Sequence, residues 1–208
     1  MIRPLVVTDC DEVLLHMVRH FRDWLGEEHG IAFALEGNPF AQSVSYVGGG
    51  KVDEADLWRL LNTFFDQEMA RQTEIEGAAA ALAELGREAD VVVLTNLVDR
   101  FGEMRTEQLR SHGIEAKVFT NQGPKGEALR RIVEEHGANR AVFIDDLAVH
   151  HTSAREVLPH VHRLHFCGEP AIAPHVPCAH QQGDAHARID TWAEALPWLL
   201  ETLHGKPA

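Results

Sequence analysis

Short runs of apolar residues alternate with longer helical patterns along much of this chain. The runs cover residues 4–9, 90–95, 116–120, 140–145 and 161–166. Continuous apolar runs of this length are typical of strands that are buried on both faces, as in a parallel sheet. Their alternation with helix-length segments predicts an α/β fold, in which helices cover both faces of a parallel sheet.

The connection between the first two runs is much longer than a strand crossover requires. It covers roughly residues 14–87, has no convincing strand pattern, and contains two apolar stripes at helical spacing. A crossover needs only ~10–12 residues, so we expect most of this stretch to form an inserted α-helical subdomain. A further helical pattern at residues 77–86 is expected to return the chain to the main domain. The predicted division is a core domain of residues 1–13 and 88–208 and a helical subdomain of residues 14–87.

Polar side chains follow three of the apolar runs, at the points where the strands would end. They are Asp9 and Asp11 after the first run, Thr95 and Asn96 after the second, and Asp145 and Asp146 after the fourth. Lys125 follows a Gly-Pro turn at the start of a predicted helix. In an open α/β sheet, ligands bind in the crevice outside the carboxyl ends of the strands. We therefore expect these side chains to share one crevice.

The chemistry of this set of side chains suits phosphoryl transfer. Asp9 and Asp11 are separated only by Cys10, and two close carboxylates require a cation, a shared proton or exposure to water. Phosphoryl transfer needs a nucleophile, neutralisation of the phosphoryl oxygens and an acid for the leaving group. Carboxylates with Mg²⁺ meet the first two needs, and the Lys125 ammonium adds a point charge for a phosphate oxygen. The sequence has no group of His and Cys at zinc spacing that would compete for this role.

Four motifs in this order resemble those of the haloacid dehalogenase superfamily. They are "DCD" (9–11), "LTN" (94–96), "PK" (124–125) and "FIDD" (143–146), and the resemblance covers the chain from about residue 4 to about residue 166. It implies a doubly wound, Rossmann-like parallel sheet core with a small α-helical cap subdomain inserted after the first strand. The inserted helical subdomain predicted above fits this expectation.

The resemblance also implies a role for each residue. Asp9 would be the nucleophile that becomes an aspartyl-phosphate, and Asp11 would protonate the leaving group and then activate water. Thr95 would bind the phosphoryl group, and Lys125 would hold both the nucleophile and the phosphate. The expected ligands of Mg²⁺ are Asp9, Asp11, Asp145 and Asp146, with Asp11 contributing its backbone carbonyl.

Asp11 bears on the reaction type. An alkoxide that leaves phosphorus needs a proton donor, whereas a halide that leaves carbon does not, so Asp11 favours a phosphomonoester hydrolase over a 2-haloacid dehalogenase. A phosphomutase would use the same acids and differ chiefly in how its cap excludes water. A protein that binds a phosphorylated ligand without turnover is a further alternative. Glu12 stands where many members of the superfamily carry Gly, which leaves the metal coordination open.

The partners expected from charge and composition are small molecules. The formal net charge of −13 would repel nucleic acid and anionic membrane, so a small phosphorylated metabolite is the expected substrate of a monomer or homodimer. Asn96 at the crevice, and Tyr46 and Lys51 around the three glycines of "SVSYVGGGK", are predicted to bind this substrate. The three Cys lack paired spacing and the start of the chain lacks a secretory segment, so we expect a cytoplasmic protein.

Overall fold

The computed structural model describes residues 3–34 and 43–205. Its centre is a six-stranded sheet in which every pair of neighbouring strands is parallel, in the order β10-β9-β8-β1-β6-β7. The strands are β1 (Leu5–Thr8), β6 (Asp90–Thr95), β7 (Lys117–Thr120), β8 (Ala141–Asp145), β9 (His162–His165) and β10 (Ala187–Arg188). From β1 the chain fills one side of the sheet with β6 and β7 and then crosses to the other side with β8. The adjacent ends of β1, β6 and β8 therefore lie at the topological switch point, where α/β sheets bind ligands.

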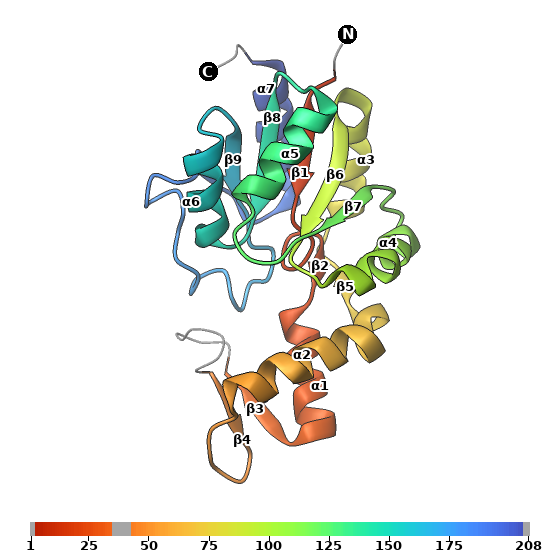
Figure 1. Cartoon of the computed structure of the whole chain (residues 1–208), viewed down its shortest axis with the longest axis vertical. Coiled ribbons are helices and arrows are strands. Elements are labelled where there is room, and N and C mark those ends of the chain that lie inside the picture. The colour runs from red at the N-terminus through yellow and green to blue at the C-terminus, as the bar shows by residue number, and fades with distance from the viewer. Residues whose placement is uncertain (1–2, 35–42, 206–208) are drawn as a thin grey trace.

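Helices cover both faces of the sheet, which confirms the predicted fold class (Figure 1). Strand residues alternate between two apolar clusters because successive side chains point to opposite faces. Val6 and Val93 pack with α3 (Ala78–Glu88) and α7 (Trp192–His204) on one face. On the other face, Val7 and Leu94 pack with α5 (Gly126–His136) and α6 (Ala148–Val157). The short α4 (Gly102–Ser111), preceded by η3 (Asp99–Phe101), lies against β7.

A second body of the chain, here called the outer lobe, comprises residues 17–34 and 43–71. Its elements are α1 (Val18–His29), β3 (Ile31–Phe33), β4 (Val44–Tyr46), α2 (Glu54–Glu68) and η2 (Met69–Arg71). Two-residue strands, β2 (Leu15–His16) and β5 (Thr73–Glu74), pair antiparallel where the chain leaves the core and returns to it. Figure 1 shows the lobe projecting beyond the carboxyl ends of the parallel strands.

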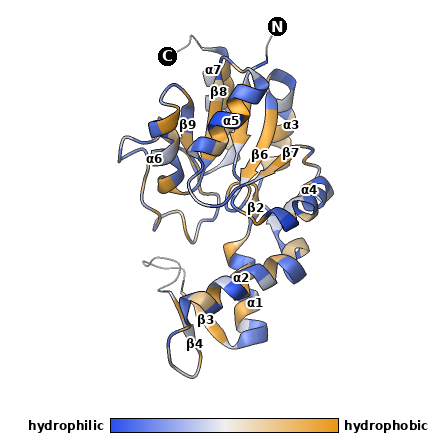
Figure 2. Cartoon of the chain, viewed as in Figure 1, coloured by the Kyte–Doolittle hydropathy of each residue, from blue (hydrophilic) through white to orange (hydrophobic). Residues whose placement is uncertain are grey.

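The lobe has an apolar cluster of its own, which is built largely from aromatic residues. Phe21 and Trp24 of α1 pack with Phe64 and Phe65 of α2, and Figure 2 shows the apolar residues of the molecule gathered on the inner sides of its elements. The Asp53 side chain caps α2 by accepting a hydrogen bond from the backbone N–H of Ala55.

Our expectation that the inserted stretch contains no strand is wrong. β3 and β4 form an antiparallel hairpin in the lobe, and β2 and β5 form a second strand pair. These strands have two or three residues each, which is too short for a period-two pattern to stand out in the sequence. The helix at 78–88 packs with the sheet cluster rather than with the lobe cluster.

No helix within residues 3–34 and 43–205 is both long enough and apolar enough to cross a membrane.

Candidate active site

Three carboxylates meet at the carboxyl ends of β1 and β8. Asp9 follows β1 directly, Asp145 ends β8 and Asp146 comes next, and the two strands are hydrogen-bonded neighbours. Carboxylate oxygens of the three residues all lie within 4.8 Å of one another, and all three side chains are buried. Residues 136 positions apart in the chain are therefore brought to one point, as the sequence predicts for strands of one parallel sheet.

Lys125 lies between two of these carboxylates. Its Nζ is 2.8 Å from Asp9 Oδ2 and 2.7 Å from Asp145 Oδ2, and the whole residue is buried at the start of α5. Burial alone would lower the pKa of Lys125, but the charges of Asp145 and Asp9 outweigh burial and raise it. Lys125 is thus a permanent cation that fixes the positions of both carboxylates.

Three carboxylates share this single cation, and their pKa values are shifted in different directions. Burial, together with the charges of Asp145 and Asp11, raises the pKa of Asp9 to about 7, although Lys125 opposes this. Burial and the same kind of repulsion raise the pKa of Asp146. Burial would also raise the pKa of Asp145, but Lys125 outweighs it and lowers the value. A divalent cation would compensate the surplus negative charge, and an all-oxygen donor set is the kind that Mg²⁺ prefers.

Thr95 carries a buried hydroxyl group at the end of β6. Thr95 ends β6, the strand beside β1, and its buried Oγ1 has no hydrogen-bond partner among the described residues. A buried hydroxyl without a partner is rare in native proteins unless a ligand or water satisfies it. The amide of Asn96, in contrast, donates to the carbonyl of Gly123 at 3.0 Å and accepts from Asn121 at 2.9 Å, so it holds the loop after β7.

The carboxylate of Asp11 lies outside the group of three. It accepts two hydrogen bonds from Arg105 Nη2, at 2.9 and 3.2 Å, and one from Gln72 Nε2 at 3.0 Å. Arg105 is completely buried on α4, and its Nη1 also donates to Gln72 Oε1 at 3.1 Å. Sequence reasoning did not find Arg105 or Gln72. Since Gln72 follows the outer lobe directly, this network joins Asp11, the core helix α4 and the point where the lobe returns to the core.

A cavity of about 520 Å³ opens beside these residues, between the outer lobe and the ends of the strands. Asp9, Asp11 and Asp146 line it on the core side, and side chains of α1 and α2 line it on the lobe side. The substrate-binding residues predicted in the lobe, Tyr46 and Lys51, are not among its lining residues. Both are exposed. Tyr46 ends β4, and Lys51 forms an isolated bridge with Ser45 of the same strand. Figure 1 places β4 at the end of the lobe away from the sheet.

Comparisons with known proteins rest on structure alone. No family model and no curated protein matches this sequence. A HAD family hydrolase from Deinococcus radiodurans, solved with bound phosphate and sodium, matches with a TM-score of 0.68 at 18% identity and covers 98% of both chains. A haloacid dehalogenase-like hydrolase from Streptococcus pneumoniae matches with a TM-score of 0.64 at 12% identity, over 95% of this chain and 98% of that one. A predicted phosphoglycolate phosphatase from Haemophilus somnus matches with a TM-score of 0.64 at 11% identity, over 94% and 97%.

The chain has the haloacid dehalogenase-like fold. This confirms the fold that the four motifs imply. Because these sequence identities lie below 20%, the comparisons show the fold and not the reaction.

Glu12 connects the loop after β1 to the first helix of the outer lobe. Its backbone φ is 60°, a left-handed conformation that glycine adopts more readily than other residues. Its Oε1 accepts hydrogen bonds from the backbone N–H groups of Met17, at 2.9 Å, and Val18, at 2.6 Å, at the start of α1. The side chain is buried and Oε2 has no hydrogen-bond partner among the described residues. Glu12 therefore fixes the first lobe helix to the loop that carries Asp9 and Asp11.

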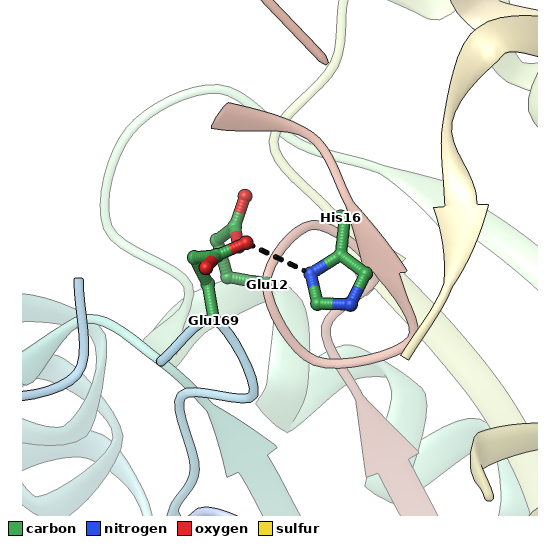
Figure 3. Close-up of side chains that lie close together, drawn as sticks. All are labelled: Glu12, His16 and Glu169. Carbon is green, nitrogen blue, oxygen red and sulfur yellow. Dashed lines mark ion pairs between the residues drawn. The ribbon is translucent and has the colours of Figure 1, made fainter. Parts of the chain in front are cut away.

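Glu12 belongs to a second cluster, with His16 and Glu169 (Figure 3). Figure 3 shows the two carboxylates side by side, with the His16 ring facing Glu169, whose Oε2 is 3.0 Å from His16 Nδ1. Arg19 of α1 binds both oxygens of Glu169, at 2.5 and 3.0 Å. Arg19 balances the charge of Glu169, and we interpret this cluster as a contact between the lobe and the core loop after β9.

Proposed function

We propose that this protein is a Mg²⁺-dependent phosphomonoester hydrolase that acts on a small phosphorylated metabolite through an aspartyl-phosphate at Asp9. The observation that carries the proposal is the position of Lys125 Nζ, in contact with both Asp9 and Asp145 beside Asp146. The unpartnered hydroxyl of Thr95 at the adjacent strand end supports it. The net charge of −13 supports a small substrate, since it disfavours anionic macromolecules.

The proposed reaction has two steps. In the first, which starts with Asp11 protonated, a carboxylate oxygen of Asp9 forms a bond to phosphorus while the ester P–O bond breaks, and the leaving alkoxide takes the proton from Asp11. In the second, water gives up a proton to Asp11 and forms a bond to phosphorus, and the bond between Asp9 and phosphorus breaks. The sum converts one ester and one water into an alcohol and phosphate, and returns both carboxyl groups to their starting states.

The other residues bind and neutralise charge. Mg²⁺ held by Asp9, Asp145 and Asp146 would neutralise the phosphoryl oxygens. Lys125 keeps the Asp9 carboxylate in place and offers its remaining N–H to a phosphoryl oxygen, and Thr95 offers its hydroxyl. Asp11 must release Arg105 or Gln72 to reach the leaving group, because its oxygens are bonded to both. A movement of the outer lobe, which ends next to Gln72, would supply that change.

Phosphate release tests the proposal. The wild-type protein should release inorganic phosphate from acetyl phosphate and p-nitrophenyl phosphate with Mg²⁺, and chelation with EDTA should stop it. Asp9→Asn should reduce the rate by roughly 10³-fold or more. Asp66→Asn, on the exposed side of α2, is the matched control and should keep the wild-type rate. Undiminished release by Asp9→Asn would overturn the mechanism, and release of halide from 2-chloropropionate would assign the protein to dehalogenation instead.

A further inference from the structure

The cavity beside Asp9 has a mainly apolar wall opposite the carboxylates. Met17 and Val18 line it from the start of α1, Leu61 and Phe65 from α2, and Leu97 and Val98 from the segment after β6. Four of these six side chains belong to the outer lobe, and Leu97 and Val98 belong to the core. The wall therefore surrounds the part of a bound ester that lies beyond its phosphoryl group.

The ionisable lining residues other than His150 are all acidic. They are Asp9, Asp11, Glu12 and Asp146, and no Lys or Arg is among the described residues that line the cavity. His150 lines the cavity as well, but burial lowers its pKa, so the ring is neutral at physiological pH.

Three cations around the site already have partners. Lys125 contacts Asp9 and Asp145, Arg105 is bonded to Asp11, and Arg19 is bonded to Glu169. A second anionic group on the substrate, placed beyond the phosphoryl group and the proposed Mg²⁺ site, would therefore find no free side-chain cation among the described lining residues. Juxtaposed like charges oppose binding strongly where water is partly excluded.

Uncharged polar groups complete the wall. The carboxamides of Asn62, Asn121 and Gln122 also line the cavity and can bond a neutral hydroxyl or carbonyl group. The volume of about 520 Å³ falls within the range of roughly 300–1,000 Å³ that is usual for small-molecule sites. An apolar body of one ring or a short branched chain fits such a space.

We propose that the alcohol part of the substrate is uncharged and mainly apolar, so that the protein acts on the phosphomonoester of a hydrophobic alcohol or phenol. This rests on the phosphatase function proposed above and narrows it. Hydroxy acid phosphates such as phosphoglycolate, and sugars with a second phosphate, are poor substrates on this account.

A matched pair of esters tests this inference. Benzyl phosphate and 4-carboxybenzyl phosphate differ by one distant carboxylate, and their leaving groups are nearly equal in basicity. The kcat/KM for benzyl phosphate should exceed that for 4-carboxybenzyl phosphate by about tenfold or more. Phosphoglycolate should be the poorer substrate as well. An equal or higher kcat/KM for the carboxylated ester would overturn the inference.

A cation placed in the wall should change this ratio. Leu61→Lys is expected to reduce the ratio of kcat/KM for benzyl phosphate to that for 4-carboxybenzyl phosphate at least threefold. Asn62→Lys repeats the test from the neighbouring position. Gln67→Lys adds the same charge to an exposed position of α2 outside the cavity and should leave the ratio unchanged. A ratio that responds equally to Leu61→Lys and Gln67→Lys would contradict a specific role of the wall.

Acetyl phosphate separates the two ways in which the inference can fail. Its small acyl group does not need the apolar wall, so its hydrolysis reports on the phosphoryl site alone. If acetyl phosphate is hydrolysed and the carboxylated ester is preferred, only the substrate class is wrong. If none of these compounds releases phosphate, the proposed function is wrong and the substrate class falls with it.

Discussion

Substitution of Glu12 by Gln tests how the buried charge between the two bodies of the molecule is balanced. Glu12 is only 2% exposed, and its one engaged oxygen accepts backbone hydrogen bonds from Met17 and Val18. The amide oxygen of Gln can accept the same bonds, so the variant removes the ionisable group and keeps the helix contact. Any change in stability then reports on the charge of Glu12.

The expected size follows from the pKa of Glu12. Burial, followed by the charges of Asp11 and Glu169, raises this pKa from 4.5 to about 8 in the folded protein, although the backbone bonds oppose the rise. The folded state therefore binds the proton more tightly than the unfolded state. The free energy of unfolding of the wild type should fall as pH rises from about 4.5 to about 8, by at most roughly 5 kcal/mol. Glu12→Gln lacks the ionisable group and should not lose this stability. Its free energy of unfolding should match that of the wild type near pH 4 and exceed it by a few kcal/mol at pH 8.5.

Urea unfolding followed by tryptophan fluorescence at several pH values measures this difference. Glu169→Gln is the matched control in the same cluster, and its expected effect on the free energy of unfolding has the opposite sign. Burial alone would raise the pKa of Glu169, but its hydrogen bonds from Arg19 outweigh burial and lower it. Glu169→Gln should therefore be less stable than the wild type at neutral pH, and the difference should vanish as pH falls below the lowered pKa. If Glu12→Gln is less stable than the wild type at pH 8.5, the ionised Glu12 carboxylate does not destabilise the folded protein.

Three other predictions concern the phosphoryl site and its support. Lys125→Met leaves Asp9 and Asp145 buried without their cation, so it should lower the free energy of unfolding in urea by about 3–5 kcal/mol at pH 8. Arg105→Met leaves Asp11 without its charged partner and should lower both stability and kcat, whereas Arg105→Met combined with Asp11→Asn should regain part of the stability in the same titration. Mg²⁺ should raise Tm more at pH 8 than at pH 5.5 in a thermal-shift assay, because Asp9, with a pKa of about 7, is ionised only at the higher pH. An equal shift at both values would contradict the place of Asp9 in the metal site.

The sheet could be predicted from the sequence because its strands are buried on both faces. β1, β6 and β8 carry unbroken apolar runs, and each ends in the polar residues that the motif order picks out. The parallel topology predicts that Asp9 and Asp145 lie at the same edge of the sheet. Their close approach also requires β8 to lie beside β1, and the structure shows this strand order.

The contacts between the two bodies could not be predicted in this way. Arg105 lies on a helix of mostly polar sequence, 94 positions from its partner Asp11. Its sequence surroundings would predict an exposed side chain. Arg19 and Glu169 are 150 positions apart, in a helix and a loop with no motif. Such pairs depend on how the lobe docks on the core, which local periodicity does not encode. Glu12 gave a partial signal, since it stands where many members of the superfamily carry Gly and adopts the left-handed backbone that Gly favours.

Covalent trapping shows directly whether Asp9 accepts the phosphoryl group. The wild-type protein should be mixed with Mg²⁺ and ³²P-labelled acetyl phosphate, quenched in acid within the first turnover, and digested for mass spectrometry. We expect a label on the peptide that contains Asp9, and none in Asp9→Asn. Phosphate release without any label on the protein, or a label on another residue, would contradict this expectation.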